Sequence, residues 1–136
     1  MFRPFVLLLV LTVCARAANA QAVIDPDTLR CSMHEGAVKV TPLHSDSLAS
    51  SFLICIHTAV KPHVHRVHTE HVTVLEGTGD MTLGAMTRAV KPGDVIVIPA
   101  GTVHSVVVTG DDPLRVLSVQ APFFDGSDRH TIDDAR

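Results

Sequence analysis

The sequence contains no tryptophan and no tyrosine, and it is short of basic residues, since 11 lysines and arginines face 14 acids. The formal net charge is −3, and no run of basic residues occurs. Nucleic acids and anionic membranes bind proteins largely through neutralised phosphates, so neither is an expected partner. The chain also lacks a Cys-x-x-Cys pair, a phosphate-cradling glycine loop and a nucleophile elbow. These absences argue against thioredoxin-like redox chemistry, nucleotide binding and serine hydrolysis.

A run of apolar residues long enough to span a bilayer is missing as well. The longest run, Phe5–Val13, follows the basic Arg3 and precedes a small-x-small cleavage site at Ala18-Asn19-Ala20. This is the layout of a secretory signal peptide, so residues 1–20 are predicted to be one. We therefore expect a secreted or periplasmic protein that has no membrane segment after cleavage. An uncleaved membrane anchor is one alternative, and lipidation at Cys14 is another, although Val13 occupies the position where a lipoprotein signal has a small residue.

A chain of this length has room for one domain with a single modest core. Residues 21–35 show little periodicity and are predicted to form an N-terminal arm. Residues 36–124 alternate short runs rich in Val, Ile and Thr with Gly, Pro and Asp turns, which is typical of an all-β antiparallel sandwich or barrel. Residues 125–136 are predicted to be a flexible tail. The predicted strands are Ala37–Thr41, Ser51–Ala59, His63–Val67, Glu70–Glu76, Asp80–Leu83, Thr87–Val90, Asp94–Ile98, Ser105–Thr109 and Leu114–Gln120.

Two cysteines follow the predicted leader, Cys31 and Cys55. In an oxidising compartment they can form a disulfide. The alternative is that Cys55 is simply a buried apolar residue of a strand. One pair with one spacing does not decide between the two interpretations.

Histidine is abundant, with nine in the chain, and His63, His65, His68 and His71 fall close together. Residues two apart on a strand project from the same face, so His63 and His65 are expected to present two imidazoles to one point. Glu70 begins the next predicted strand, where its carboxylate can complete the set. The alternative is a histidine-rich surface tract that binds metal only adventitiously.

A second segment argues against that alternative. The two segments read His63-x-His65-(x)4-Glu70-(x)6-Gly77 and Gly93-(x)5-Pro99-x-Gly101-(x)2-His104. Together they resemble the two motifs of the cupin superfamily, and the resemblance extends from about Gly36 to Phe124. It implies an antiparallel cupin barrel, also called a double-stranded β-helix or jelly roll. The chain departs from the family pattern at Val108, where the second motif commonly ends in Asn.

Carried over residue by residue, the resemblance implies that His63, His65, Glu70 and His104 bind one divalent metal ion. Three neutral imidazoles and a carboxylate suit Fe(II), Mn(II), Ni(II), Cu(II) or Zn(II), and disfavour Ca²⁺ and Mg²⁺. Affinity alone favours copper, so the sequence does not identify the metal. A five- or six-coordinate ion would keep open positions for a substrate or dioxygen.

Alternation from Glu70 and His104 predicts an apolar cavity beside the metal. Such a cavity suits a small, partly hydrophobic ligand with one or two oxygens for the metal. The predicted lining residues are Val72, Val74, Met81, Leu83, Val106 and Val108.

Several residues near the motifs are given separate interpretations. His71 follows Glu70 and is predicted to point outward. His68 is interpreted first as a solvated loop histidine, with a partner of the metal ligands or a proton-transfer group at the cavity mouth as the alternative. The segment Phe123-Phe124-Asp125 is predicted to pack over a barrel end, with a lid as the alternative. Arg129-His130 is predicted to lie in a solvated, frayed terminus.

Two functions remain open. The first is a metal-dependent dioxygenase or lyase acting on a small organic substrate, with Glu70 or His68 as catalytic groups that move protons. The second is a non-catalytic module that binds or senses a small ligand or a metal, which the scarcity of further polar groups favours. A homodimer formed through the N-terminal strands is common in the superfamily and is expected here.

Overall fold

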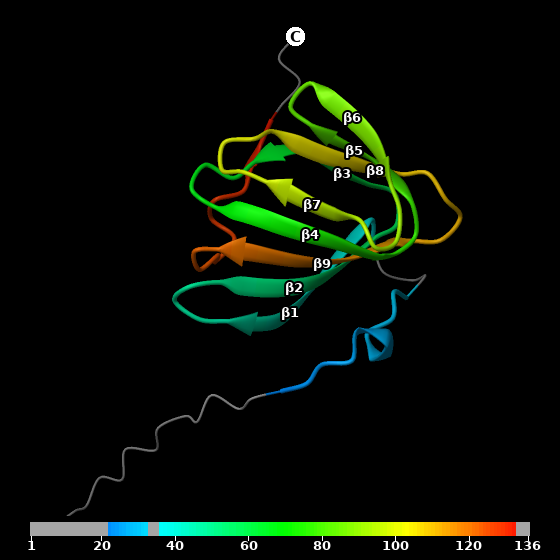
Figure 1. Ribbon diagram of the computed structural model, residues 1–136, viewed down its shortest axis with the longest axis horizontal. Helices are drawn as coiled ribbons and strands as arrows, with labels where there is room; N and C mark the ends of the chain where they lie inside the picture. The colour runs from blue at the N-terminus through cyan, green and yellow to red at the C-terminus, as the bar shows by residue number, and fades with distance from the viewer. Residues whose placement is uncertain (1–21, 33–35, 133–136) are drawn as a thin grey trace, which may run out of the picture.

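The computed structural model describes residues 22–32 and 36–132. Its strands are β1 (Val38–Ser45), β2 (Ser50–Ile56), β3 (Ala59–Val64), β4 (Thr69–Glu76), β5 (Gly79–Leu83), β6 (Met86–Val90), β7 (Val95–Ile98), β8 (His104–Val108), β9 (Leu114–Ala121) and β10 (His130–Thr131). They form two five-stranded sheets, in the orders β1-β2-β9-β4-β7 and β10-β3-β8-β5-β6 (Figure 1). Every pair is antiparallel, and strands distant in sequence lie side by side. This jelly-roll arrangement confirms the predicted fold class.

The described residues contain one short helical element, the 3₁₀ turn η1 (Pro26–Thr28). None of them forms a helix that is long and apolar enough to cross a membrane.

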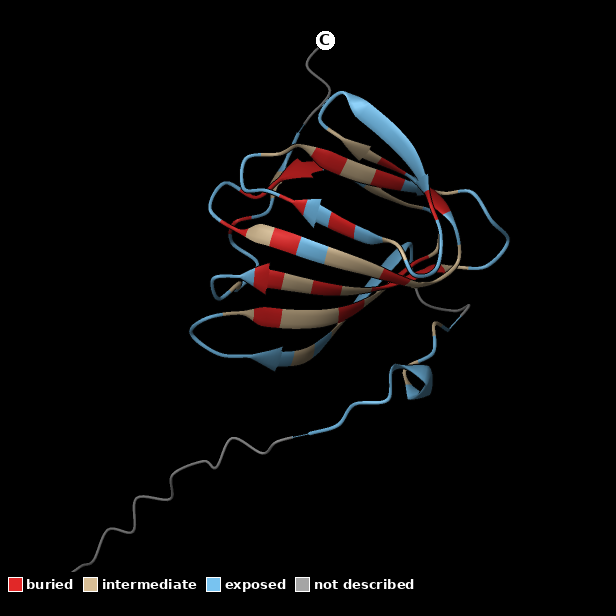
Figure 2. Cartoon of the chain, in the orientation of Figure 1, coloured by how far each residue is buried: buried red, intermediate tan, exposed pale blue. Residues whose placement is uncertain are grey.

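The strands alternate between buried and exposed residues because successive side chains of a strand point to opposite faces. In β7, Ile96 and Ile98 are buried while Val95 and Val97 are exposed (Figure 2). The same alternation in β4 buries Glu70 and exposes His71, which confirms the outward orientation predicted for that histidine. The inward faces of the two sheets enclose the core.

Glycines shape the tight turns that the sequence marked. Gly77, between β4 and β5, and Gly93, before β7, have φ of 76° and 91°, in the left-handed region that favours glycine. A Cβ on Gly77 would also lie 2.9 Å from the Cα of Leu114. Only glycine therefore fits this turn.

One pair of strand boundaries differs from the prediction. A strand was predicted at 51–59 and another at 63–67, but β2 ends at Ile56 and β3 runs from Ala59 to Val64. The short turn between them interrupts an apolar run without any Gly or Pro, so the sequence carried no turn signal there. As a result His65 lies just after the end of β3 and not within a strand.

The prediction of a flexible, solvated tail is wrong for residues 126–132. His130 and Thr131 form β10, which pairs with Val64 and His63 of β3. Asp128 is only 8% exposed. The physical reason is that the carboxylate of Asp128 accepts hydrogen bonds from the loop between β3 and β4, which holds the segment against the barrel. Residues 133–136 lie outside the described residues, as does the predicted signal peptide 1–20.

A disulfide and an ion pair join the N-terminal arm to the barrel. Cys31 and Cys55 form a disulfide with their Cα atoms 5.6 Å apart, which decides the question that the sequence left open. Arg115, 2% exposed on β9, forms ion pairs with Asp27 of the arm at 3.0 Å and with Glu76 at 2.9 Å. A buried guanidinium is thus neutralised from both sides, by the arm and by β4.

Candidate metal centre and cavity

Three histidines from two strands and one loop meet inside the barrel. His63 is on β3, His65 follows it, and His104 begins β8 directly opposite His63 in the register. One ring nitrogen from each lies within 4.8 Å of the others, and all three side chains are buried. Side chains from two separated motifs therefore converge on a position that can hold a metal ion, as the sequence predicted.

Backbone carbonyls fix the tautomer of each ring. The Nδ1 atoms of His63, His65 and His104 lie 2.9, 2.7 and 3.0 Å from the carbonyl oxygens of Lys61, Asp128 and Thr102. A carbonyl oxygen only accepts hydrogen bonds, so each Nδ1 carries the proton. In the neutral form of each ring Nε2 then keeps a lone pair, which is the arrangement found when histidine binds metal through Nε2.

The Nε2 of His104 has no hydrogen-bond partner within the described residues, although it is buried. A buried acceptor without a partner is destabilising, and a cation at this point would satisfy it. Burial, together with the neighbouring His104, lowers the pKa of His63 to about 4. The His63 ring is therefore neutral near pH 7, as a metal ligand must be.

Glu70 stands beside the three rings at the start of β4. Its Oε2 lies 3.6 Å from Nε2 of His65 and 3.4 Å from Nε2 of His104. Its Oε1 accepts a hydrogen bond of 2.5 Å from the hydroxyl of Ser118, which is fully buried on β9. Burial raises the pKa of Glu70, but the adjacent rings of His104 and His65 and the hydroxyl of Ser118 favour the carboxylate more strongly and lower the pKa. Glu70 is thus an anion: Ser118 holds its Oε1 by a hydrogen bond, and its Oε2 faces His65 and His104.

A cavity of about 470 Å³ opens beside this group, a size typical of small-molecule sites. Its walls are mostly aliphatic. Four of the predicted lining residues, Val72, Val74, Met81 and Val106, do line it. Leu83 and Val108 pack against the core and are not among the lining residues.

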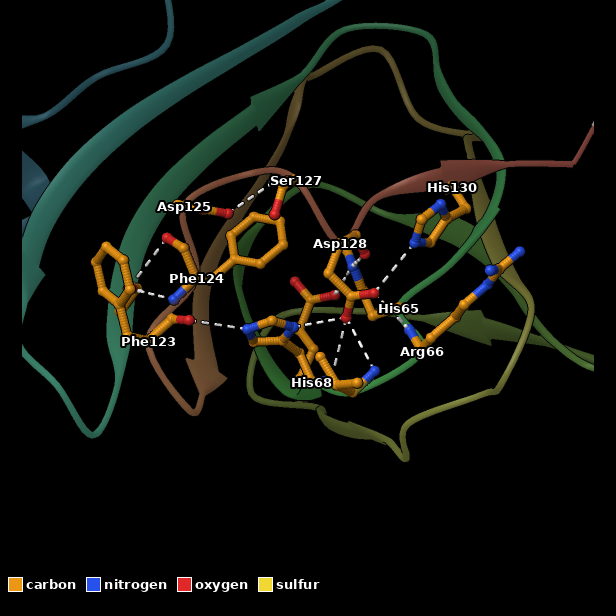
Figure 3. Close-up of polar contacts among 12 residues, drawn as sticks. His65, Arg66, His68, Phe123, Phe124, Asp125, Ser127, Asp128 and His130 are labelled. Atoms are coloured by element: carbon orange, nitrogen blue, oxygen red, sulfur yellow. Dashed lines mark hydrogen bonds and ion pairs between the residues drawn. The ribbon is translucent and has the colours of Figure 1, made fainter.

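The C-terminal segment contributes Asp128, which organises the loop between β3 and β4 (Figure 3). Its carboxylate accepts hydrogen bonds from the backbone N–H groups of Arg66, Val67 and His68 at 2.9, 3.0 and 3.2 Å. The Nδ1 of His68 lies 2.6 Å from the same carboxylate, and Nε2 of His130 lies 3.2 Å from it. Since its backbone carbonyl also accepts a hydrogen bond from His65, Asp128 connects the C-terminal segment directly to one of the three converging rings.

His68 is buried and not solvated, so the first interpretation of this residue is wrong. Its Nε2 lies 2.9 Å from the carbonyl oxygen of Phe123, and its Nδ1 faces Asp128. Both nitrogens face acceptors, so both carry protons and the ring is an imidazolium. Burial lowers the pKa of His68, but the hydrogen bond to Asp128 outweighs it and the pKa is raised. The ring does not line the cavity, so its position favours a structural role over proton transfer.

Phe124 packs between the β3–β4 loop and β2, as predicted for the segment after β9. Its ring centroid lies 5.2 Å from that of His65, 5.0 Å from that of His68 and 6.2 Å from that of Phe52, each in an edge-on arrangement. Phe123 is exposed. Phe124 therefore closes one side of the cavity and supports two histidines.

Three residues of the site were missed by sequence analysis: Ser118, Gln120 and Asp128. Period-two alternation within the predicted strand at 114–120 carried a signal for the first two, because Leu114 and Val116 place them on the inward face. Alternation alone could not place Ser118 and Gln120 near Glu70, because that depends on the pairing of β9 with β4. Asp128 had no local signal, since an acid in a polar tail is normally solvated.

Comparisons with known proteins agree with this geometry. A model of the cupin domain family matches residues 52–120. An uncharacterized protein of Aquifex aeolicus (strain VF5) is 34% identical over 96 residues, which cover 71% of this chain and 78% of that protein.

Solved structures of similar fold include an uncharacterized protein with a double-stranded β-helix domain from Klebsiella pneumoniae subsp. pneumoniae MGH 78578. It has a TM-score of 0.71 at 20% identity over 84% of this chain and 99% of its own. The nucleoside dehydratase Pac13 of Streptomyces has a TM-score of 0.62 at 16% identity, over 73% of this chain and 81% of its own. At these identities the two structures establish the fold alone.

Proposed function

This chain belongs to the cupin family, and we propose that it is an exported metalloprotein that acts as a dioxygenase or lyase on a small organic substrate. The ligands of the metal are His63, His65 and His104, with Glu70 as the fourth. The observation that carries the proposal is the convergence of three buried imidazoles on one point, while backbone carbonyls accept a hydrogen bond from each Nδ1 and leave Nε2 to bind a metal ion.

The donor set supports one divalent transition ion, Fe, Mn, Ni, Cu or Zn, because three nitrogens and one carboxylate oxygen are borderline ligands. Such an ion supplies Lewis-acid chemistry and, where it is redox-active, dioxygen chemistry. Glu70 is the protein's acid–base candidate: its Oε2 faces the cavity side of the histidines, and Ser118 holds its Oε1.

A non-catalytic ligand-binding or sensory module is the second candidate function. It is favoured by the cavity wall, in which Glu70 is the sole carboxylate among the described lining residues and no tyrosine or cysteine appears. An enzyme commonly places more than one proton-transfer group in its pocket.

Metal content and oxygen consumption test the proposal and separate the two functions. Elemental analysis of purified protein is expected to show about one transition ion per chain, because the described residues contain one group of converging histidines. The His104→Ala variant should lose the ion, while His71→Ala, which removes an exposed histidine next to Glu70, should keep it.

Oxygen uptake or product formation is then measured with the protein loaded with Fe(II), Mn(II) or Ni(II), over a panel of diketones, flavonols and carboxylates. Turnover that disappears in His104→Ala supports the enzyme, and its complete absence with a bound metal supports the binding module.

Two further parts of the proposal concern the whole chain. Export predicts that the mature protein begins at Gln21, which N-terminal mass spectrometry of the exported protein tests.

We also propose a homodimer formed along β1, which is an edge strand carrying the half-exposed Val38 and Val40. Light scattering after size exclusion is expected to give twice the chain mass, and a monomer alone would contradict the dimer.

A further inference from the structure

We infer that the cavity binds a small organic carboxylate with an apolar body, and that Arg129, Lys61 and Gln120 receive its polar end. The inference deepens the proposed function and rests on it for the nearby metal, but the receiving residues belong to the protein itself.

The cavity is polar at one end and apolar at the other. Along β4 the inward side chains run from Glu70 to Val72 and Val74. Strand β9, which pairs with β4, repeats the gradient in register from Gln120 to Val116, and β8 of the opposite sheet runs from His104 to Val106. A ligand that fills such a space has a polar group at the histidine end and hydrocarbon at the other.

Two cations line the cavity at the edge formed by β3 and β10. Lys61 is on β3, and Arg129 directly precedes β10. Both are exposed, and neither forms an ion pair within the part of the chain that the structure describes. Arg129 is near enough to His63 to contribute to the lowered pKa of that ring.

The charges of the cavity wall favour an anion. Glu70 is the one acid among the described lining residues, and it is directed to the metal-binding histidines. A divalent ion at the histidines would leave a net positive charge beside Arg129 and Lys61. Arginine pairs with carboxylates through two parallel hydrogen bonds, which a neutral group of the same shape cannot reproduce.

Gln120 supplies an independent observation. It lies directly opposite Glu70 in the β4–β9 register, lines the cavity and is 5% exposed, yet its side-chain Oε1 has no hydrogen-bond partner within the described residues. Leaving a buried amide oxygen without a partner is unfavourable unless a ligand or a water satisfies it. Because an amide carries an acceptor and two donors, Gln120 can bond to a hydroxyl or, turned over, to a carboxylate oxygen.

The test uses the purified full chain, loaded with zinc and also free of metal, in titration calorimetry with phenylacetate and with neutral phenylacetamide. Zinc is redox-inert, so binding is measured without turnover. We expect phenylacetate to bind roughly tenfold more tightly than phenylacetamide, since charge-assisted hydrogen bonds are about twice as strong as neutral ones. The preference should fall as salt is raised, because exposed charges are screened.

The double variant Lys61→Gln/Arg129→Gln should lose roughly tenfold in phenylacetate affinity and leave phenylacetamide unchanged. The matched control is Arg88→Gln, which removes an exposed cation of β6 that does not line the cavity. Gln120→Leu, which keeps the size of the side chain, is expected to weaken both ligands several-fold. Equal affinity for the two ligands, or a phenylacetate affinity that the double variant leaves intact, would overturn the inference.

Failure of the inference is distinguishable from failure of the proposed function. If the protein binds no metal, the metal-free titrations still report on Arg129, Lys61 and Gln120. If phenylacetate binds the zinc form but is insensitive to the double variant, the carboxylate is held by the metal alone. In that case the metal site stands and the inference is wrong.

Discussion

At the scale of single residues, the proposed metal centre depends on groups that orient the side chains of the site. Each histidine donates Nδ1–H to a backbone carbonyl, so no side-chain substitution can remove these hydrogen bonds directly. Glu70 differs, because its orientation depends on the side chain of Ser118. Ser118 is therefore the residue through which the carboxylate can be tested without touching a ligand.

The Ser118→Ala variant is expected to bind metal about tenfold more weakly, since partners that hold metal ligands typically contribute tenfold or more to affinity. Without the hydroxyl, Oε1 of Glu70 loses its hydrogen bond and the carboxylate can rotate away from the histidines. Competitive titration of Zn(II) against a chromophoric chelator measures the change. Ser51→Ala is the control and should bind as the parent does, because the Ser51 hydroxyl on the adjacent strand β2 bonds to the carbonyl oxygen of His44 and not to the site. An unchanged affinity in Ser118→Ala would show that Glu70 needs no orienting partner.

At the scale of elements, the C-terminal segment functions as part of the site although it follows the barrel in sequence. Asp128 holds three consecutive N–H groups of the β3–β4 loop and the imidazolium of His68. Strand β10 continues this attachment along β3. The loop that carries His65 is thus held between two strands and a buried carboxylate.

Replacing Asp128 by Asn is expected to weaken metal binding about tenfold and to lower the urea midpoint of unfolding. An amide keeps one acceptor, so it cannot serve both the loop N–H groups and His68, and the His68 imidazolium loses its counter-charge. Metal titration and urea unfolding measure the two effects. Asp125→Asn is the control, because the Asp125 carboxylate bonds to the nearby Ser127 and not to the N–H groups of the β3–β4 loop. Equal midpoints for the two variants would contradict the role given to Asp128.

At the scale of the whole molecule, the N-terminal arm and the barrel form one unit. The Cys31–Cys55 disulfide joins the arm to β2, and Arg115 joins it to β9 through Asp27 and the carbonyl oxygen of Pro26. The arm covers Arg115, whose side chain is almost entirely buried. Without the arm this guanidinium would lose one of its two carboxylate partners.

Reduction of the disulfide is expected to destabilise the protein by about 3.5 kcal/mol, the chain-entropy value for a closed loop of this size. The two cysteines are 24 residues apart in sequence. Thermal unfolding with and without a reductant measures the change, and the midpoint should fall by several degrees. The Cys31→Ser/Cys55→Ser variant should already have the lower midpoint and be insensitive to reductant. A reductant-insensitive midpoint in the parent protein would mean that the bond does not stabilise the fold.

Much of this architecture was readable from the sequence because it depends on short-range patterns. Alternation of apolar residues and the glycines at 77 and 93 specified strands and turns, and two spaced motifs specified the family and the three histidines that converge. The strand boundaries around His57 and Thr58 were wrong because no turn residue marks them.

What the sequence by itself determined is the β-class, the family and three histidines that meet as predicted. Only the tertiary structure decided which residues support them: the Ser118 hydroxyl on Glu70, the Asp128 carboxylate on His68, the pairing of Cys31 with Cys55 and the cations at the cavity edge. The physical reason is distance along the chain. Periodicity reports which face a residue occupies, whereas a hydrogen bond between residues 48 or 60 positions apart depends on strand register and packing.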